Sequence, residues 1–503
     1  MNSNFPVDGD DVSRARALRF LASDSFVHFI GAGLLGLGSF ILVPLYTRTL
    51  RPDQFGIYAL IDISVVILVL TSQAKLDVAY LKMFADLDPS RYPALLGSVL
   101  TAGFSGAVVG GGVLAFAAWS SLGGRFLHTD ERSFAWTLLP IVILEALQGL
   151  FLSDLRARRR AVRYCTSTLT RLLAMVGATI WFLSFQHLGL YGLFLGRMLG
   201  DMAGVLLLFV FCRANLVLTC DLSILRPMLY FGAPLIWGAV MMLLMDAAGR
   251  YVLTQYRGLA DVGYLGAALK ISSIFQMLVT QPFGIAWGGL MFQMAKWPNA
   301  KVIYSQIFSY VLLLASGVAC IIAIFTRQLF HIFATQSYAP GMVLLPFLLL
   351  VRAIGIMEYP AAISIYLAGR TSWFAAIYTA AFLVNFGLNV WLDKAQGAMG
   401  VIIAWIAGWI VITALMRIVG QRVYRLDNHW WLWIVSVLPW LVLGALGPGR
   451  LSEIVAMKVA LQCASALVIA TVLVTLALIE YRRFRSEPRL RTSSVEEEVC
   501  IAE

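Results

Sequence analysis

The sequence predicts an all-α polytopic membrane protein of about 14 transmembrane helices, arranged as two pseudo-symmetric six-helix lobes around a central cavity plus two C-terminal helices. Three observations predict this fold. Of the 503 residues, 60% are hydrophobic and only 13% are charged, apolar windows of spanning length recur along the chain, and its two halves repeat. Soluble domains contain about 25% charged residues, so an ordinary globular domain is excluded, in agreement with the mean hydropathy of +0.82.

Windows long enough to cross a bilayer define the predicted helices in order. A spanning helix needs about 20 mostly apolar residues. Such windows cover 22–46, 57–81, 95–118, 134–155, 166–185, 189–212, 229–254, 262–290, 303–325, 340–367, 373–392, 398–416, 431–447 and 456–480. They predict an N-terminal lobe at 22–213, a connection at 214–228, a C-terminal lobe at 229–416 and a last helix pair at 431–480.

The distribution of charge predicts the orientation in the membrane. Lys and Arg gather on the N-terminal segment and on alternate loops, as in the run RARRRAVR at 156–163, and are sparse on the opposite loops. Because cytoplasmic loops carry the excess of basic residues, segments 1–21, 214–228 and 481–503 are predicted to be cytoplasmic. Residues 1–19 are polar and do not form a signal peptide. The net charge of +11 therefore reflects topology, and no nucleic-acid partner is expected.

The sequence contains no motif that indicates a metal, a cofactor or catalysis. The six cysteines lack CxxC or metal-ligand spacing; they are Cys165, Cys212, Cys220, Cys320, Cys463 and Cys500. GxSxG and HExxH are absent, and the predicted loops are short. A polymerase, ligase or glycosyltransferase is therefore not favoured.

A repeat relates the two halves. PLYTRTLRPDQFGIYALIDI (44–63) aligns with GRYVLTQYRGLADVGYLGAALKI (249–271), so that Gly56 matches Gly263. Parallel repeats around an axis normal to the membrane are one way in which transporters build a central path. The repeat therefore favours a transporter.

Ionised side chains within the predicted spans are the candidate functional residues. On insertion scales each costs about 2.5–3.5 kcal/mol at a helix centre, so these groups are predicted to face a wetted interior or one another. The basic ones are Lys75, Arg171, Arg197, Arg250, Lys270 and Arg352, and the acidic ones are Asp62, Asp77, Glu145, Asp201, Asp246 and Glu358. Arg171 and Asp77 lie near helix ends, where a side chain can reach the interface, and are set aside.

Spacing suggests partners for some of these charges. Asp246 and Arg250 are four residues apart, as are Arg197 and Asp201, and so each pair shares a helix face. An ion pair and a substrate role both remain open for them. Lys75, Lys270 and Arg352 have no opposite charge three or four residues away, although Asp62 and Glu358 are available on other helices.

A basic cavity selects its substrate by charge. It attracts a polar or anionic substrate, phosphate above all, and repels a lipophilic cation. The aromatic residues Trp237, Tyr251, Trp287 and Tyr359 fit either an interfacial belt or stacking on sugar rings.

The two repeat segments resemble a known family. LVPLYTRTLRPDQFGIYAL (42–60) and MDAAGRYVLTQYRGLADVGYLGAALKI (245–271) are similar to the Wzx-type flippases of the multidrug/oligosaccharidyl-lipid/polysaccharide superfamily. The resemblance implies translocation of undecaprenyl-pyrophosphate-linked oligosaccharide repeat units across the bacterial inner membrane, by alternating access, for exopolysaccharide, capsule or O-antigen assembly. It also implies contact with membrane lipids and with a polysaccharide polymerase or export machinery.

The resemblance also implies roles for the intramembrane charges. Pyrophosphate and sugar would be held by Arg250 and Lys270, with Arg352, Lys75, Arg197 and Arg48 in the same cavity. The acidic or coupling residues would be Asp246, Asp62, Asp201 and Glu358. The first span has no arginine before Arg48, which disfavours a lipid II substrate. The alternative is a cation-coupled multidrug exporter of the same superfamily, a branch that usually has twelve spans and a carboxylate-centred site.

Overall fold

The computed structural model describes residues 40, 42–120, 134–217, 219–295, 300–370 and 372–423. Within these ranges the chain is helical and contains no strand. The predicted helices 431–447 and 456–480, the two predicted terminal segments and most of the predicted first span lie outside the described residues.

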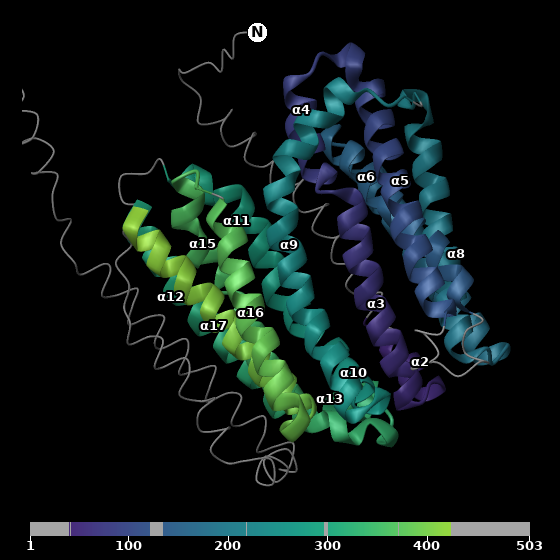
Figure 1. Ribbon diagram of the computed structural model, residues 1–503, viewed down its shortest axis with the longest axis vertical. Helices are drawn as coiled ribbons and strands as arrows, with labels where there is room; N and C mark the ends of the chain where they lie inside the picture. Colours follow the sequence, from purple (N-terminus) through teal and green to yellow (C-terminus); the bar gives the residue numbers. More distant parts are fainter. Residues whose placement is uncertain are drawn as a thin grey trace, which may run out of the picture.

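One bundle of helices is built from the first half of the chain and a second bundle from the rest (Figure 1). The first contains α2 (Val43–Thr49), α3 (Pro52–Gln73), α4 (Leu76–Asp86), α5 (Tyr92–Trp119), α6 (Ala135–Ala157), α7 (Ala161–Ile180) and α8 (Gly189–Cys212). The second contains α9 (Leu222–Arg257), α10 (Leu259–Phe275), α11 (Gln281–Met294), α12 (Ala300–Ile324), α13 (Thr326–Phe333), α14 (Leu345–Gly355), α15 (Glu358–Leu367), α16 (Ser372–Gln396) and α17 (Ala398–Val423). We call them the N-lobe and the C-lobe.

Eleven described helical segments, from Pro52–Phe84 to Ala398–Arg422, are long and apolar enough to cross a membrane. They coincide in order with the predicted spans from 57–81 to 398–416, and the all-α polytopic fold is thereby confirmed. One boundary shifts in α9, which begins at Leu222, within the predicted connection. Asp221 caps this helix by accepting a hydrogen bond from the Ser223 amide at 2.9 Å.

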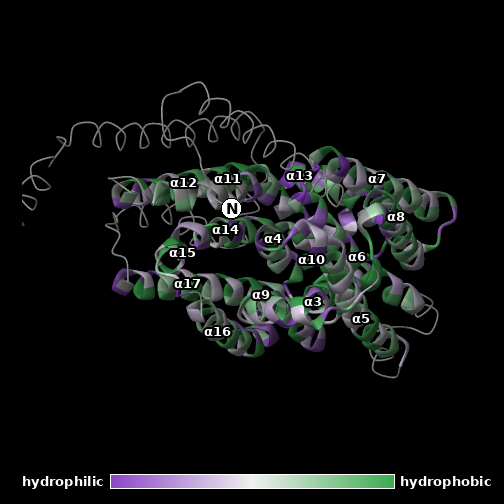
Figure 2. Cartoon of the chain, turned by 90° about the horizontal axis from the view of Figure 1, so that it is seen from above, coloured by the Kyte–Doolittle hydropathy of each residue, from purple (hydrophilic) through white to green (hydrophobic). Residues whose placement is uncertain are grey.

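Apolar side chains fill the core of each lobe and continue across the contact between the lobes, and the outer surface is apolar too. In Figure 2 hydrophobic residues cover most of the helices. Val109, Trp119 and Trp391 are among the large apolar side chains left largely exposed. A soluble protein rarely leaves so much apolar surface in water, whereas lipid solvates it.

The lobes approach most closely where α3 meets α10. A Cβ added at Gly56 would lie 2.0 Å from the Leu259 carbonyl oxygen, and one added at Gly263 would lie 1.8 Å from the Pro52 carbonyl oxygen. The contacts are reciprocal, since Leu259 and Pro52 each stand four residues before the matched glycine. A pseudo-twofold relation between the lobes requires this reciprocity, and only glycine permits so close a backbone approach.

Hydrogen bonds reinforce the same end of the lobe interface. Thr47 Oγ1 donates to the Phe333 carbonyl (2.8 Å), and Thr335 Oγ1 donates to the Thr47 carbonyl (2.9 Å). The buried Tyr338 hydroxyl donates to the Leu50 carbonyl at 2.9 Å. These contacts join α2 to α13 and to the 3₁₀ segment Gln336–Leu344. On the predicted topology this end is periplasmic.

Removing the Tyr338 hydroxyl should measurably weaken the contact between the lobes at this end. In Tyr338→Phe the buried Leu50 carbonyl loses its partner, and an unsatisfied buried group costs about 1–3 kcal/mol. The expected result is a lower apparent melting temperature of the detergent-solubilised protein. Tyr230→Phe is the matched control, because its ring is largely exposed. Equal melting temperatures for the two variants would contradict the assigned role.

Candidate functional site

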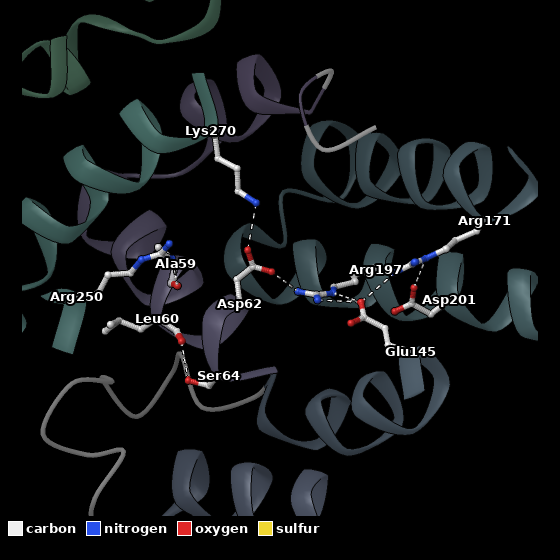
Figure 3. A network of polar contacts seen from close by, with 10 residues as sticks. All are labelled: Ala59, Leu60, Asp62, Ser64, Glu145, Arg171, Arg197, Asp201, Arg250 and Lys270. Carbon is white, nitrogen blue, oxygen red and sulfur yellow. Dashed lines mark hydrogen bonds and ion pairs between the residues drawn. The ribbon is translucent and has the colours of Figure 1, made fainter. Parts of the chain in front are cut away.

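The intramembrane charges meet in a chain of ion pairs that starts at the lobe interface (Figure 3). Lys270 Nζ on α10 lies 3.1 Å from Asp62 Oδ2 on α3, so this pair bridges the two lobes. The other oxygen of Asp62 lies 2.8 Å from Arg197 Nη1 on α8. One carboxylate therefore holds two basic groups.

The chain continues into the N-lobe. Arg197 Nη2 lies 2.8 Å from Glu145 Oε1 on α6, and the same oxygen lies 3.0 Å from Arg171 Nη2 on α7. Arg171 Nε then pairs with Asp201 Oδ1 at 2.7 Å. Acids and bases alternate in the order Lys270, Asp62, Arg197, Glu145, Arg171 and Asp201, and we call these six residues the ionic network. Its formal charges cancel.

A cavity of about 280 Å³ lies beside the ionic network. All the members of the network except Asp201 line it, together with Tyr46, Tyr58 and apolar side chains of the N-lobe. Lys270 is the most exposed member at 25%, whereas Asp201 is fully buried. An anion in this N-lobe cavity would therefore compete with Asp62 for Lys270.

Arg250 forms a separate contact at the lobe interface. Its Nη2 donates to Asp246 Oδ2 at 2.9 Å, and its Nη1 donates to the Ala59 carbonyl on α3 at 3.0 Å. The predicted pairing of Asp246 with Arg250 along one helix face is confirmed. Nearby, the hydroxyls of Tyr251 and Ser64 are 2.6 Å apart. Arg250 thus couples α9 to the backbone of α3.

The predicted pairing of Arg197 with Asp201 along one helix face is wrong. Both lie on α8, but Arg197 reaches Asp62 and Glu145, and Asp201 pairs with Arg171. Setting Arg171 aside as a side chain that reaches the interface is also wrong, because it joins the buried Asp201 to the partly buried Glu145. The sequence predicts Glu145 as an intramembrane charge and not as a site residue. The one sequence signal for a role of Glu145 is its position inside a predicted span.

The remaining predicted site residues lie apart from the ionic network. Arg48 is exposed at the end of α2. Lys75 has a left-handed backbone (φ 57°) at the break between α3 and α4. Glu358 accepts a hydrogen bond from the Tyr378 hydroxyl. Of these three residues, none lines the N-lobe cavity.

Arg352 lines a second cavity of about 220 Å³ within the C-lobe, together with Asp246. Of the six bases predicted to share one cavity, Lys270 and Arg197 line the N-lobe cavity and Arg352 lines the C-lobe cavity. Arg250, Lys75 and Arg48 line neither cavity. In the described part of the chain, no group of three or more His, Cys, Asp or Glu side chains could hold a metal ion.

Comparisons with known proteins place this architecture. A family model described as polysaccharide biosynthesis protein matches residues 21–295. No curated protein matches the sequence. Among solved structures, the lipid II flippase MurJ in an inward closed conformation aligns with a TM-score of 0.66 at 11% identity, covering 92% of this chain and 99% of that one.

Two conformations of a multidrug resistance MATE family transporter of the MOP superfamily are also similar. The inward-facing structure has a TM-score of 0.64 at 14% identity, with 77% of this chain and 93% of that chain covered. The outward-facing structure has a TM-score of 0.56 at 15% identity, with 80% and 95% covered. At these identities the likeness shows a shared fold.

Proposed function

Because the chain belongs to the polysaccharide biosynthesis protein family, we propose that it is a flippase for undecaprenyl-pyrophosphate-linked oligosaccharide repeat units. It would move them across the bacterial inner membrane for exopolysaccharide, capsule or O-antigen assembly. The family match over residues 21–295 is the observation that carries the proposal. The two-lobed membrane fold, shared with a lipid II flippase, supports it, and a downstream polysaccharide polymerase is the proposed partner.

Through the ionic network, the proposed cargo could change the contact between the lobes. Lys270 and Asp62 join α10 to α3, and this pair is the most accessible link of the network. A pyrophosphate can accept charge-assisted hydrogen bonds from Lys270 and Arg197 in place of Asp62. Exchange of partners at this position would loosen the contact between the lobes, so that cargo binding favours their rearrangement.

Lys270→Met is expected to abolish polymer formation in a deletion strain that is complemented with the variant. The side chain keeps its apolar length but no longer binds Asp62 or phosphate. Polymer on the cell surface and lipid-linked repeat units in the membrane fraction are the measurements, and the repeat units should accumulate as polymer disappears. Lys394→Met is the control, because Lys394 is exposed at the end of α16.

Two results would contradict the proposal. Normal polymer in the deletion strain itself would reject the flippase function. Increased sensitivity of that strain to toxic lipophilic cations, with polymer unchanged, would favour the multidrug exporter instead. Normal polymer with Lys270→Met alone would reject only the role of Lys270.

A further inference from the structure

The turn between α6 and α7 is rich in arginine and takes no part in the ionic network. Six arginines lie where α6 and α8 end and α7 begins: Arg156, Arg158, Arg159, Arg160, Arg163 and Arg213. Arg163 Nη1 donates to the Phe211 carbonyl at 3.4 Å, so the turn reaches the end of α8, where Arg213 follows. On the predicted topology this end of the N-lobe is cytoplasmic.

Nearby acids do not balance these arginines. The three carboxylates of α6, α7 and α8 are Glu145 and Asp201 of the ionic network and Asp154, which pairs with Arg158 at 2.7 Å. The other five arginines make no ion pair with any residue that the structure describes. We call these five residues the arginine patch: Arg156, Arg159, Arg160, Arg163 and Arg213. Such a group of like charges attracts an anion.

One member of the arginine patch occupies a backbone position that suits glycine. Arg159 follows the end of α6 with a left-handed backbone (φ 54°), and its amide donates to the Arg156 carbonyl at 3.0 Å. The same turn follows α15 in the C-lobe, between the fourth and fifth predicted spans of each lobe. There Gly369 has φ 65°, and its amide donates to the Tyr366 carbonyl at 3.0 Å. Because a Cβ disfavours this conformation, the arginine at 159 points to a role of its side chain other than closing the turn.

An apolar stripe runs along α7 away from the arginine patch. Val162, Leu169 and Leu173 are 74%, 39% and 62% exposed, and their spacing of seven and four residues places them on one helix face. In Figure 2 α7 lies at the outer edge of the N-lobe, where it packs on α6 and α8. In a bilayer this stripe therefore contacts acyl chains, and the arginine patch lies at the level of the lipid headgroups.

We propose that the arginine patch and the apolar stripe of α7 form a binding site for one anionic phospholipid of the surrounding bilayer. The headgroup phosphate pairs with Arg159 and Arg163, and an acyl chain lies along the stripe. Guanidinium groups bind phosphate through paired charge-assisted hydrogen bonds. The first turn of α7, which has no acidic residue and no side-chain cap, adds to the positive potential.

This site differs from a topology signal and from the cargo site. The positive-inside rule requires basic residues only somewhere in a cytoplasmic loop, whereas the lipid site requires an arginine at position 159. No member of the arginine patch lines the N-lobe cavity or the C-lobe cavity. The lipid site therefore does not depend on the proposed flippase function.

Lipid binding to the purified full-length protein tests this site. The protein is delipidated in detergent and mixed with phosphatidylglycerol or phosphatidylcholine of the same acyl chains, and bound lipid is counted by native mass spectrometry. Phosphatidylglycerol should bind at least about tenfold more tightly, as expected for charge-assisted hydrogen bonds. Arg159→Gly/Arg163→Gln should abolish that preference. Arg370→Gln, which removes the exposed arginine after Gly369 in the equivalent turn, should leave it unchanged.

Thermal stability separates lipid binding from a merely structural role of Arg159. Without anionic lipid, Arg159→Gly should melt at a higher temperature than the wild type, because glycine adopts the left-handed conformation more readily. Added phosphatidylglycerol should raise the melting temperature of the wild type more than that of Arg159→Gly, since a ligand stabilises the protein that binds it. Misfolding of the variant cannot produce these two opposite effects.

Three results with these variants would overturn the proposal. They are equal binding of the two lipids to the wild type, an unaltered preference in the double variant, and a lower melting temperature of lipid-free Arg159→Gly. Deletion of residues 494–503, which contain four Glu and no Lys or Arg, should leave the lipid preference unchanged. If that deletion instead increases phosphatidylglycerol binding severalfold, the arginine patch binds this acidic segment and the lipid site is rejected.

Discussion

Gly263→Ala should part the two lobes at the α3–α10 junction and abolish polymer formation. The new Cβ would lie 1.8 Å from the Pro52 carbonyl oxygen, and this neighbour is backbone that cannot rotate away. Overpacking of this kind costs about 1–3 kcal/mol, which corresponds to about fivefold to 150-fold in the equilibrium between closed and open junctions. Leu50 is buried at this end of the interface, so a cysteine placed there reports on opening. Leu50→Cys combined with Gly263→Ala should react about tenfold faster with a membrane-impermeant maleimide than Leu50→Cys alone.

The repeat supplies a second variant, and the chain supplies matched controls. Gly56→Ala should reproduce the effect, because its Cβ would lie 2.0 Å from the Leu259 carbonyl oxygen. Gly112→Ala in α5 and Gly387→Ala in α16 should be silent, since an added Cβ meets nothing within 4 Å at either position. If the cysteine at position 50 still reacts slowly and polymer is normal in both junction variants, the close contact between α3 and α10 is not required for function.

The sequence predicted the helices and the repeat because both depend on local patterns. Every span must be apolar over its own length, whatever it packs against. The Gly56 and Gly263 match was detectable for a related reason: the structure uses the same close backbone contact twice, and each copy requires glycine at the same place in its repeat. Both requirements act on the residues of one segment, so each can be detected in that segment alone.

Partners of the intramembrane charges could not be predicted in the same way. The i,i+4 rule identifies Asp246 with Arg250, where both side chains stay on one helix. The rule fails for Arg197, which forms ion pairs with carboxylates on α3 and α6. Those partners come from segments far apart in sequence, and only helix packing determines which of several opposite charges lies within reach. The predicted net basic cavity was inferred without these pairings, whereas the ionic network is balanced and Arg352 stands outside it.

Arg171→Met should be the most destabilising change in the ionic network. Asp201 is fully buried, and Arg171 is its ion-pair partner at 2.7 Å, so the variant leaves a buried carboxylate without a cation. Breaking a buried pair in this way costs about 3–5 kcal/mol. The expected result is little monodisperse protein after detergent extraction and a much lower apparent melting temperature. Loss of the exposed pair in Arg51→Met, with side chains 67% and 39% exposed, should cost at most about 1 kcal/mol.

Removing Asp201 as well separates electrostatics from packing. In Arg171→Met/Asp201→Asn the network keeps Lys270 and Arg197 opposite Asp62 and Glu145, so its formal charges cancel again and no buried carboxylate is isolated. The double variant should therefore recover most of the lost stability, although it carries more substitutions than the unstable single variant. If both melt equally low, lost packing around the guanidinium stem is responsible. If Arg171→Met melts like the wild type, Asp201 is already neutral in the folded protein, and the network then carries one net positive charge with which to attract the cargo.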